Sequence, residues 1–231
     1  MFDINFKKMS YNIMWRRVPL FCVSSFSVHN SNLVCECNSK EIPFKNETTF
    51  HSLNDLEFKR FKDERIIHVY GSIDKELAVI IKDSLEQLDS ENNLPIKLII
   101  NSSGGETSQG LSICDKMNKV KSEVHTQCDG ECGSIASLIL ANGTEGKRTI
   151  TPNSTVYIHE PYTSFGEGSS FTIFELNGTL KSLKIQIEKI LNILMKVTGK
   201  SSSEIEELMK NNITLTSEES VKNKIVDSIV K

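Results

Sequence analysis

Alternation of strands and helices is the feature of this 231-residue chain that most limits its fold. Between residues 65 and 160, short apolar runs are each followed by a segment whose apolar residues recur every three or four positions. The short runs are typical of buried strands, and the longer spacing is typical of amphipathic helices. Strands and helices in alternation form right-handed βαβ units on a mainly parallel sheet. The sequence therefore predicts an α/β fold.

The expected elements follow one another along the chain. Strands are expected at residues 65–71, 96–100, 124–128, 148–151 and 155–159, and helices at 74–88, 111–120 and 134–141. Further on, the sequence predicts helices at 179–197, 202–210 and 217–223 and strand-like pieces at 213–215 and 225–229. The apolar stripe of the longest helix is wider than one small domain needs, which favours contacts between subunits.

Composition excludes several classes of function. A net charge of -3 gives no electrostatic reason to expect nucleic acid as a partner. No apolar run reaches the roughly 18 residues that a transmembrane helix needs, so we expect no membrane partner. The six cysteines lack the paired spacing of a zinc site. We therefore expect neither a metal nor a cofactor.

The N-terminal residues differ from the rest of the chain. Residues 1–40 are basic, rich in serine and poor in acids. This composition is typical of an organelle-targeting segment, and a disordered tail that has no targeting role is the alternative. Residues 41–64 have scattered aromatics without a clear period and are interpreted as an N-terminal arm. Residues 65–231 are expected to form the folded domain.

Three groups in the alternating region are typical of a serine acyl-transfer site. Gly104 and Gly105 follow a strand, where their backbone N–H groups can face an oxyanion. Ser134 stands at a helix start, where the helix dipole favours developing negative charge. His159 follows a strand and can accept and return a proton. Taken singly, Ser134 is also explained as a helix N-cap residue, and His159 as an ordinary histidine at the end of a strand.

In combination these motifs resemble a known family. Residues 101–105, Asn-Ser-Ser-Gly-Gly, are similar to an Asn-Ser-Pro-Gly-Gly motif, and residues 158–161, Ile-His-Glu-Pro, to Ile-His-Gln-Pro. Residues 133–136, Gly-Ser-Ile-Ala, stand where a nucleophile motif stands, and residues 226–229, Val-Asp-Ser-Ile, match a C-terminal landmark. Together they resemble the proteolytic subunit of the Clp protease, a serine peptidase of the crotonase-like fold that serves protein quality control.

The resemblance implies a role for each residue of the site. Ser134 would be the nucleophile and His159 the general base, and the N–H groups of Gly105 and Ile135 would form the oxyanion hole. The third member of the triad falls at Asn212, where the family has aspartate. The resemblance also implies repeated βαβ units with a long protruding oligomerisation helix, placed at residues 170–198.

The asparagine decides between hypotheses of function. An amide has no charge with which to stabilise an imidazolium, so the first hypothesis is a silent or impaired ring subunit similar to plastid paralogues. The second is an active serine endopeptidase that uses Ser134, His159 and Asn212. The third is another enzyme of the crotonase-like fold, acting on a coenzyme A thioester.

Partners and location follow from the same resemblance. It implies a heptameric ring of identical subunits, or a mixed ring with an active subunit, acting on unfolded polypeptides. A Clp-type AAA+ chaperone is the further partner implied, although Lys97, Ile99 and Lys119 stand where the family has docking aromatics. The expected location is the stroma of an apicoplast-like plastid, with the mitochondrial matrix as the alternative.

Overall fold

The computed structural model describes part of the chain, namely residues 27–29, 32–34, 61, 63–165 and 169–230. The chain divides into two units, residues 1–53 and 54–231. In the first unit β1 (Ser27–His29) pairs antiparallel with β2 (Asn32–Val34). Most of the predicted targeting segment (1–40) and of the predicted arm (41–64) lies outside the described residues, so these two interpretations stay predictions.

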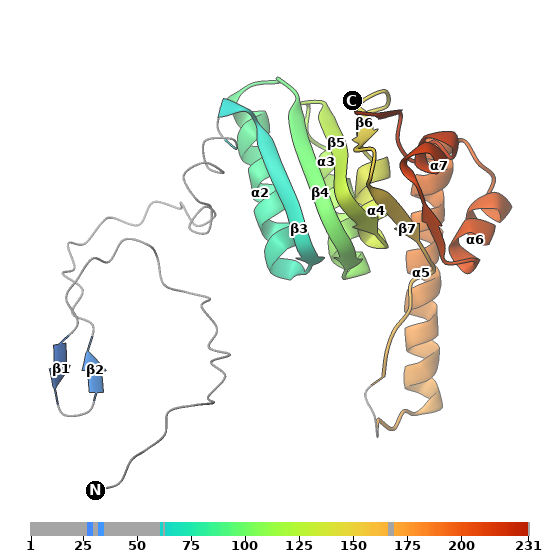
Figure 1. Cartoon of the computed structure of the whole chain (residues 1–231). Coiled ribbons are helices and arrows are strands. Elements are labelled where there is room, and N and C mark those ends of the chain that lie inside the picture. The colour runs from blue at the N-terminus through green and yellow to red at the C-terminus, as the bar shows by residue number, and fades with distance from the viewer. Residues whose placement is uncertain (1–26, 30–31, 35–60, 62, 166–168, 231) are drawn as a thin grey trace, which may run out of the picture. The chain divides into compact units, whose positions relative to one another are not determined.

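The second unit is built on a mainly parallel sheet (Figure 1). Its strands run in the order β3-β4-β5-β6-β9, with bounds Ile66–Ile73, Ile96–Gly105, Val124–Gly133, Arg148–Ile150 and Ser228–Ile229. All neighbours along this path are parallel. β7 (Thr155–Ile158) joins the second half of β5, also in parallel, and β8 (Ile213–Leu215) pairs antiparallel with β7. The predicted α/β fold is confirmed.

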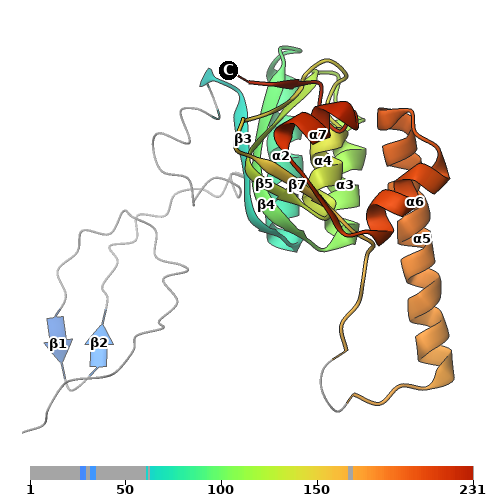
Figure 2. The ribbon, with the colours of Figure 1, turned by 45° about the vertical axis from the view of Figure 1, so that its right-hand side comes forward.

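Helices α2, α3 and α4 cover one face of this sheet (Figures 1 and 2). Their bounds are Lys75–Glu91, Thr107–Met117 and Ile135–Ala141. Every residue of α4 is buried, and this helix contacts both β4 and β5. Its apolar sequence, Ile-Ala-Ser-Leu-Ile-Leu-Ala, suits a helix enclosed on all sides. The core of the unit therefore surrounds the helix that begins directly after Ser134.

The long helix α5 (Ile173–Thr198) projects beyond the sheet (Figure 1). A capping box of Thr172 and Glu175 starts it, and Gly199, with a φ of 70°, ends it. The periodicity predicted a start at residue 179, but the capping box begins the helix ahead of its apolar stripe. Only the last turns carry buried residues, among them Ile190 and Leu194. Helices α6 (Ser202–Lys210) and α7 (Ser217–Lys222) follow.

Arg148 joins three distant parts of this unit. Its Nη2 lies 2.6 Å from Oδ1 of Asp227, and its Nε donates to Oδ2 over 3.1 Å. The same guanidinium donates through Nη1 to the carbonyl of Ala141 (3.2 Å) and to that of Val197 (3.4 Å). These carbonyls belong to the last turns of α4 and α5, whose negative dipole ends favour a cation. One buried side chain thus ties both helices to the chain that enters β9.

Strands β4 and β5 are longer than their sequences predict. Both were expected to end at the apolar runs, at residues 100 and 128, because polar residues follow. Both instead continue through a shift of register between Ile100 and Ser102. Beyond the shift, β5 pairs with β7 from Glu131 to Gly133. Backbone pairing on a new neighbour therefore overrides the polar composition of this stretch.

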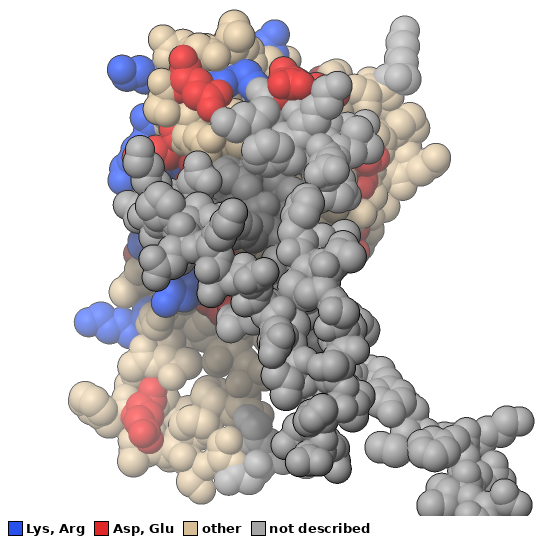
Figure 3. Space-filling view, turned by 90° about the vertical axis from the view of Figure 1, so that its left-hand side faces the viewer, with Lys and Arg blue, Asp and Glu red and all other residues tan. Residues whose placement is uncertain are grey.

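Charged side chains of both signs share the surface. In the face shown in Figure 3, lysines, arginines, aspartates and glutamates occur close together where described atoms are visible. None of the described helices is long and apolar enough to cross a membrane.

Candidate active site

Ser134 occupies a strained turn between β5 and α4. Its φ of 52° and ψ of −126° lie in a region that residues with a Cβ rarely adopt. The N–H of Ser134 donates to the carbonyl of Tyr157 (2.8 Å), and its carbonyl accepts from Oγ of Ser137 (2.6 Å). Ser134 occupies the N-cap position of α4, but its side chain makes no capping hydrogen bond to the helix. The backbone bonds thus fix the position of Ser134, while its hydroxyl is not used to cap α4.

The glycine pair brings the end of β4 against this turn. A Cβ built on Gly104 would lie 2.7 Å from Cβ of Ser134 and 3.4 Å from the backbone nitrogen of Ile135. A Cβ on Gly105 would collide with the backbone of Ile73. Both glycines also have a positive φ, which favours a residue without a Cβ. The absence of a side chain at Gly104 therefore lets the end of β4 approach the turn at Ser134, while Gly105 allows close pairing with β3 at Ile73.

His159 and Asn212 flank one end of the antiparallel ladder of β7 and β8. The ladder of β7 and β8 pairs Tyr157 with Thr214 and Ile158 with Ile213. His159 directly follows β7 and Asn212 directly precedes β8, so each stands one residue beyond the last pair of the ladder. His159 is half-buried, and Asn212 is exposed with a φ of 47°. The predicted third residue and the predicted base thus stand at the same end of one ladder, although they lie far apart in the sequence.

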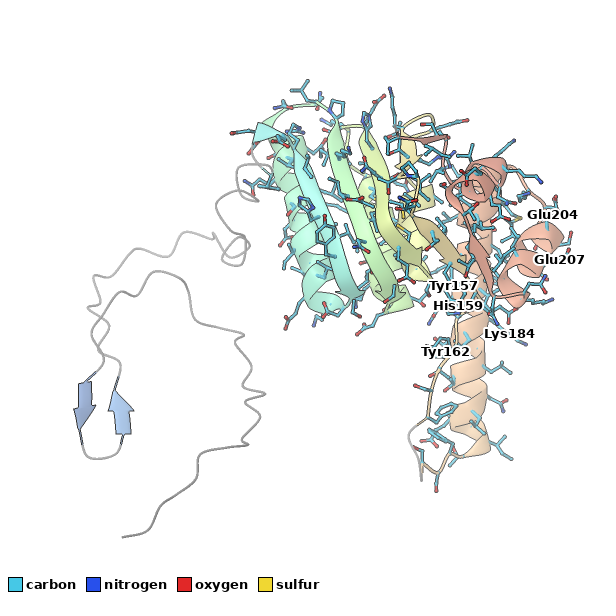
Figure 4. All side chains as sticks on the ribbon, in the orientation of Figure 1. Tyr157, His159, Tyr162, Lys184, Glu204 and Glu207 are labelled. Carbon is cyan, nitrogen blue, oxygen red and sulfur yellow. The ribbon has the colours of Figure 1, made fainter. Side chains whose placement is uncertain are left out.

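The imidazole of His159 lies against two tyrosine rings (Figure 4). The ring of Tyr157 is stacked on it, with centroids 5.1 Å apart and planes inclined by 24°. The ring of Tyr162 is tilted by 43°, at 5.6 Å. Among the described residues, this imidazole makes ring contacts with the two tyrosines and no hydrogen bond to Ser134 or Asn212. Sequence reasoning missed both tyrosines, although they stand two residues before and three residues after the histidine.

A small cavity brings the predicted nucleophile and base together. Its volume is about 20 Å³, and Ser134, Ile135 and His159 are among its lining residues. The rest of its wall is mostly apolar and comes from α4, β7, α5 and α6, through Leu138, Ile158, Ile190, Leu194 and Met209. Gly105 and Asn212 do not line it. Such a wall suits a nonpolar side chain, and the volume is that of about one water molecule.

Cys132, the thiol nearest to Ser134 in sequence, is unsuited to nucleophilic attack. Burial raises the pKa of Cys132 well above its ordinary value, and the neighbouring Cys128 raises it further. A thiol that stays protonated is a poor nucleophile. The hydroxyl of Ser134 therefore remains the candidate. No group of three or more histidine, cysteine, aspartate or glutamate side chains could hold a metal ion within the described ranges.

Comparison with known proteins adds to this geometry. A model of the Clp protease family matches residues 51–231, a range that includes Ser134, His159 and Asn212. The chain is also similar to the ATP-dependent Clp protease proteolytic subunit 1 of Thermobifida fusca (strain YX). The two are 33% identical over 193 residues, which cover 82% of this chain and 85% of that protein.

Proposed function

The chain belongs to the Clp protease family, and from this membership we propose that it is a ring subunit whose own active site is silent or strongly impaired. The family and its crotonase-like α/β fold are as the sequence predicted. The observation that carries the proposal is an asparagine, Asn212, directly before β8 at the end of the ladder where His159 leaves β7. A carboxylate is missing where a serine peptidase needs one.

The missing charge affects the proton-transfer step. When Ser134 attacks a carbonyl, its proton passes to His159, and the resulting imidazolium needs a nearby negative charge. A neutral amide cannot supply that charge, and it can hold the imidazole in the wrong tautomer. The same acid-to-amide change in a serine protease of another fold lowers kcat by about 10⁴-fold. We therefore expect very slow acylation of Ser134.

Among the residues that the structure describes, those next to Asn212 and those lining the cavity supply no carboxylate in its place. The residues next to Asn212 in sequence, Asn211 and Ile213, are uncharged. The lining of the cavity beside Ser134 is also uncharged, apart from any proton on His159. Glu160 adjoins His159 in sequence, but it is exposed and follows an extended strand, where successive side chains point to opposite sides.

The long helix supports an architectural role. Its projecting part carries large apolar side chains that are exposed in the single chain, namely Ile173, Phe174, Leu176, Leu180 and Ile185. A patch of this kind marks a contact with another protein. We propose that it contacts further Clp subunits, in a heptameric ring of identical chains or in one mixed with active subunits.

An active serine endopeptidase is the second candidate. The strained backbone of Ser134 and the close approach of Gly104 favour it, because a purely structural subunit needs neither. Unfolded polypeptides would be its substrates and a Clp-type AAA+ chaperone its partner. Lys97, Ile99 and Lys119, which replace docking aromatics, weaken the case for direct chaperone contact through this subunit.

Covalent labelling separates the two candidates. The assembled full-length protein is incubated with a serine-directed fluorophosphonate, and its intact mass is followed over time. The variants Ser134→Ala and Asn212→Asp are treated in parallel. The impaired-subunit proposal expects slow or no labelling of the wild type and a large gain in Asn212→Asp. Wild-type labelling as fast as that of Asn212→Asp, and absent from Ser134→Ala, would establish the active peptidase instead.

We further propose that the protein acts in the stroma of an apicoplast-like plastid, with the mitochondrial matrix as the alternative. The basic, acid-poor composition of residues 1–40 supports an organelle. A fusion of residues 1–40 to a fluorescent protein, imaged beside plastid and mitochondrial markers, tests this. A diffuse cytosolic signal would contradict it.

A further inference from the structure

The two tyrosines that contact His159 lie at distances where a ring attracts a cation. Their centroids are 5.1 Å (Tyr157) and 5.6 Å (Tyr162) from the imidazole centroid. Cation–π attraction operates within about 6 Å of a ring centroid, because the face of an aromatic ring carries partial negative charge. An imidazole that gains a proton in this place therefore meets a favourable field from two rings.

We propose that Tyr157 and Tyr162 are positioning residues that stabilise the protonated imidazole of His159, in part replacing the carboxylate missing at position 212. The proposal rests on the function proposed above, in which His159 is the base and Asn212 is the uncharged third residue. The rings act through His159 alone and make no bond to the substrate.

The geometry of the stack fits this role. The planes of Tyr157 and His159 are inclined by only 24°, so the two rings are stacked nearly parallel, with their centroids 5.1 Å apart. The two ring nitrogens lie at the edge of the imidazole, where a face contact leaves them available. One nitrogen can then serve Ser134 and the other Asn212. A stacked ring thus fixes the plane of the base without competing for its protons.

Tyr162 has no evident structural purpose. Its side chain is 77% exposed, and it belongs to the irregular segment that leaves β7 after Pro161. An exposed tyrosine in such a segment contributes little to burial of apolar surface, so its replacement is expected to leave the fold intact. This makes Tyr162 the better of the two positions for a test.

Other charged groups surround the site and must be considered. Glu160 is next to His159 in sequence, and Figure 4 shows Lys184 on α5 and Glu204 and Glu207 on α6 around the same end of the molecule. All four side chains are exposed, where solvent screens them. Residues that line the cavity beside His159 from α4, α5 and α6 are uncharged. A comparison of variants at position 162 keeps all these groups constant.

The test follows modification of His159 with diethyl pyrocarbonate, which reacts with the unprotonated imidazole. The assembled full-length protein is treated at a series of pH values, and the extent at His159 is read by peptide mass spectrometry. In Tyr162→Leu the pH midpoint of the reaction is expected to fall by about half a unit, since one exposed ring is lost. In Tyr162→Phe, which keeps the ring, the midpoint is expected to stay at the wild-type value.

The midpoint separates the proposal from trivial effects. Greater access to His159 in Tyr162→Leu raises the plateau rate but does not move the midpoint. An unchanged midpoint in Tyr162→Leu, or an equal fall in Tyr162→Phe, would overturn the proposal. The readout needs no catalytic activity. A wild type that proves fully active with fluorophosphonate would therefore refute the impaired-subunit proposal and leave the result on the rings standing.

Discussion

His159 and Asn212 each lie one residue beyond the last pair of the β7–β8 ladder, in which Ile158 faces Ile213. The three residue pairs of this ladder therefore bring position 212 to the end of the sheet at which His159 leaves β7. An amide there gives hydrogen-bonding capacity without charge. The first prediction concerns this position.

Asn212→Asp is expected to increase peptidase activity by a large factor, with the reverse of an acid-to-amide loss of about 10⁴-fold as its upper limit. The rate of hydrolysis of a fluorogenic peptide by the assembled protein measures it. Asn211→Asp is the matched control, because it adds the same charge one residue away, at the exposed C-cap of α6. Equal gains in both variants would show that general charge, and not the triad position, is responsible.

Gly104→Ala is expected to abolish any reactivity of Ser134. The new Cβ would lie 2.7 Å from Cβ of Ser134, at a backbone φ of +108°. Labelling by fluorophosphonate in an Asn212→Asp background measures the loss. Gly178→Ala in α5 is the control, since a Cβ there meets nothing within 4 Å. That control is expected to raise stability by up to about 1 kcal/mol, as alanine is the better helix former.

Asp227→Asn is expected to lower the free energy of unfolding by about 3–5 kcal/mol, because it leaves the buried guanidinium of Arg148 without its charged partner. Urea denaturation of the full-length chain measures the change. Glu86→Gln removes the exposed pair with Lys116 and is expected to cost about 0.5 kcal/mol. If the two changes are similar, the Arg148 pair has no special role.

Stability is expected to fall in acid through the same pair. Burial alone would raise the pKa of Asp227, but the hydrogen bonds and charge of Arg148 outweigh it and hold that pKa below the ordinary 3.8. A group with a lowered pKa stabilises the fold above its unfolded pKa, and this stabilisation is lost as pH falls through the folded value. The unfolding free energy of wild type should therefore decrease as the pH falls below the ordinary 3.8 and through the lower folded pKa of Asp227. In Asp227→Asn this part of the slope should be absent.

The alternation of strands and helices could be predicted because the two spacings of apolar residues differ clearly along residues 65–160. The extensions of β4 and β5 could not, because they depend on a register shift after Ile100 and on pairing with a strand that comes later in the chain. The capping residues Thr172 and Glu175 mark the start of α5, but the spacing of apolar residues, on which the prediction of residue 179 was based, does not report them.

The candidate site was predictable in part for the same reason. Motif order indicated Ser134 and His159, and these two do line one cavity. The neighbourhood of Asn212 came only from a family resemblance, since no local spacing relates it to His159. The tyrosine contacts depend on how the chain turns after Pro161, which sequence period does not report.

The guanidinium of Arg148 links the C-terminal turns of α4 and α5. It donates to the carbonyl of Ala141 at one end of α4, while Ser134 precedes the other end of that short, buried helix. It also donates to the carbonyl of Val197 near the end of α5. The C-terminal turns of α4 and α5 are therefore held together by one side chain, and α4 is the helix that begins directly after Ser134.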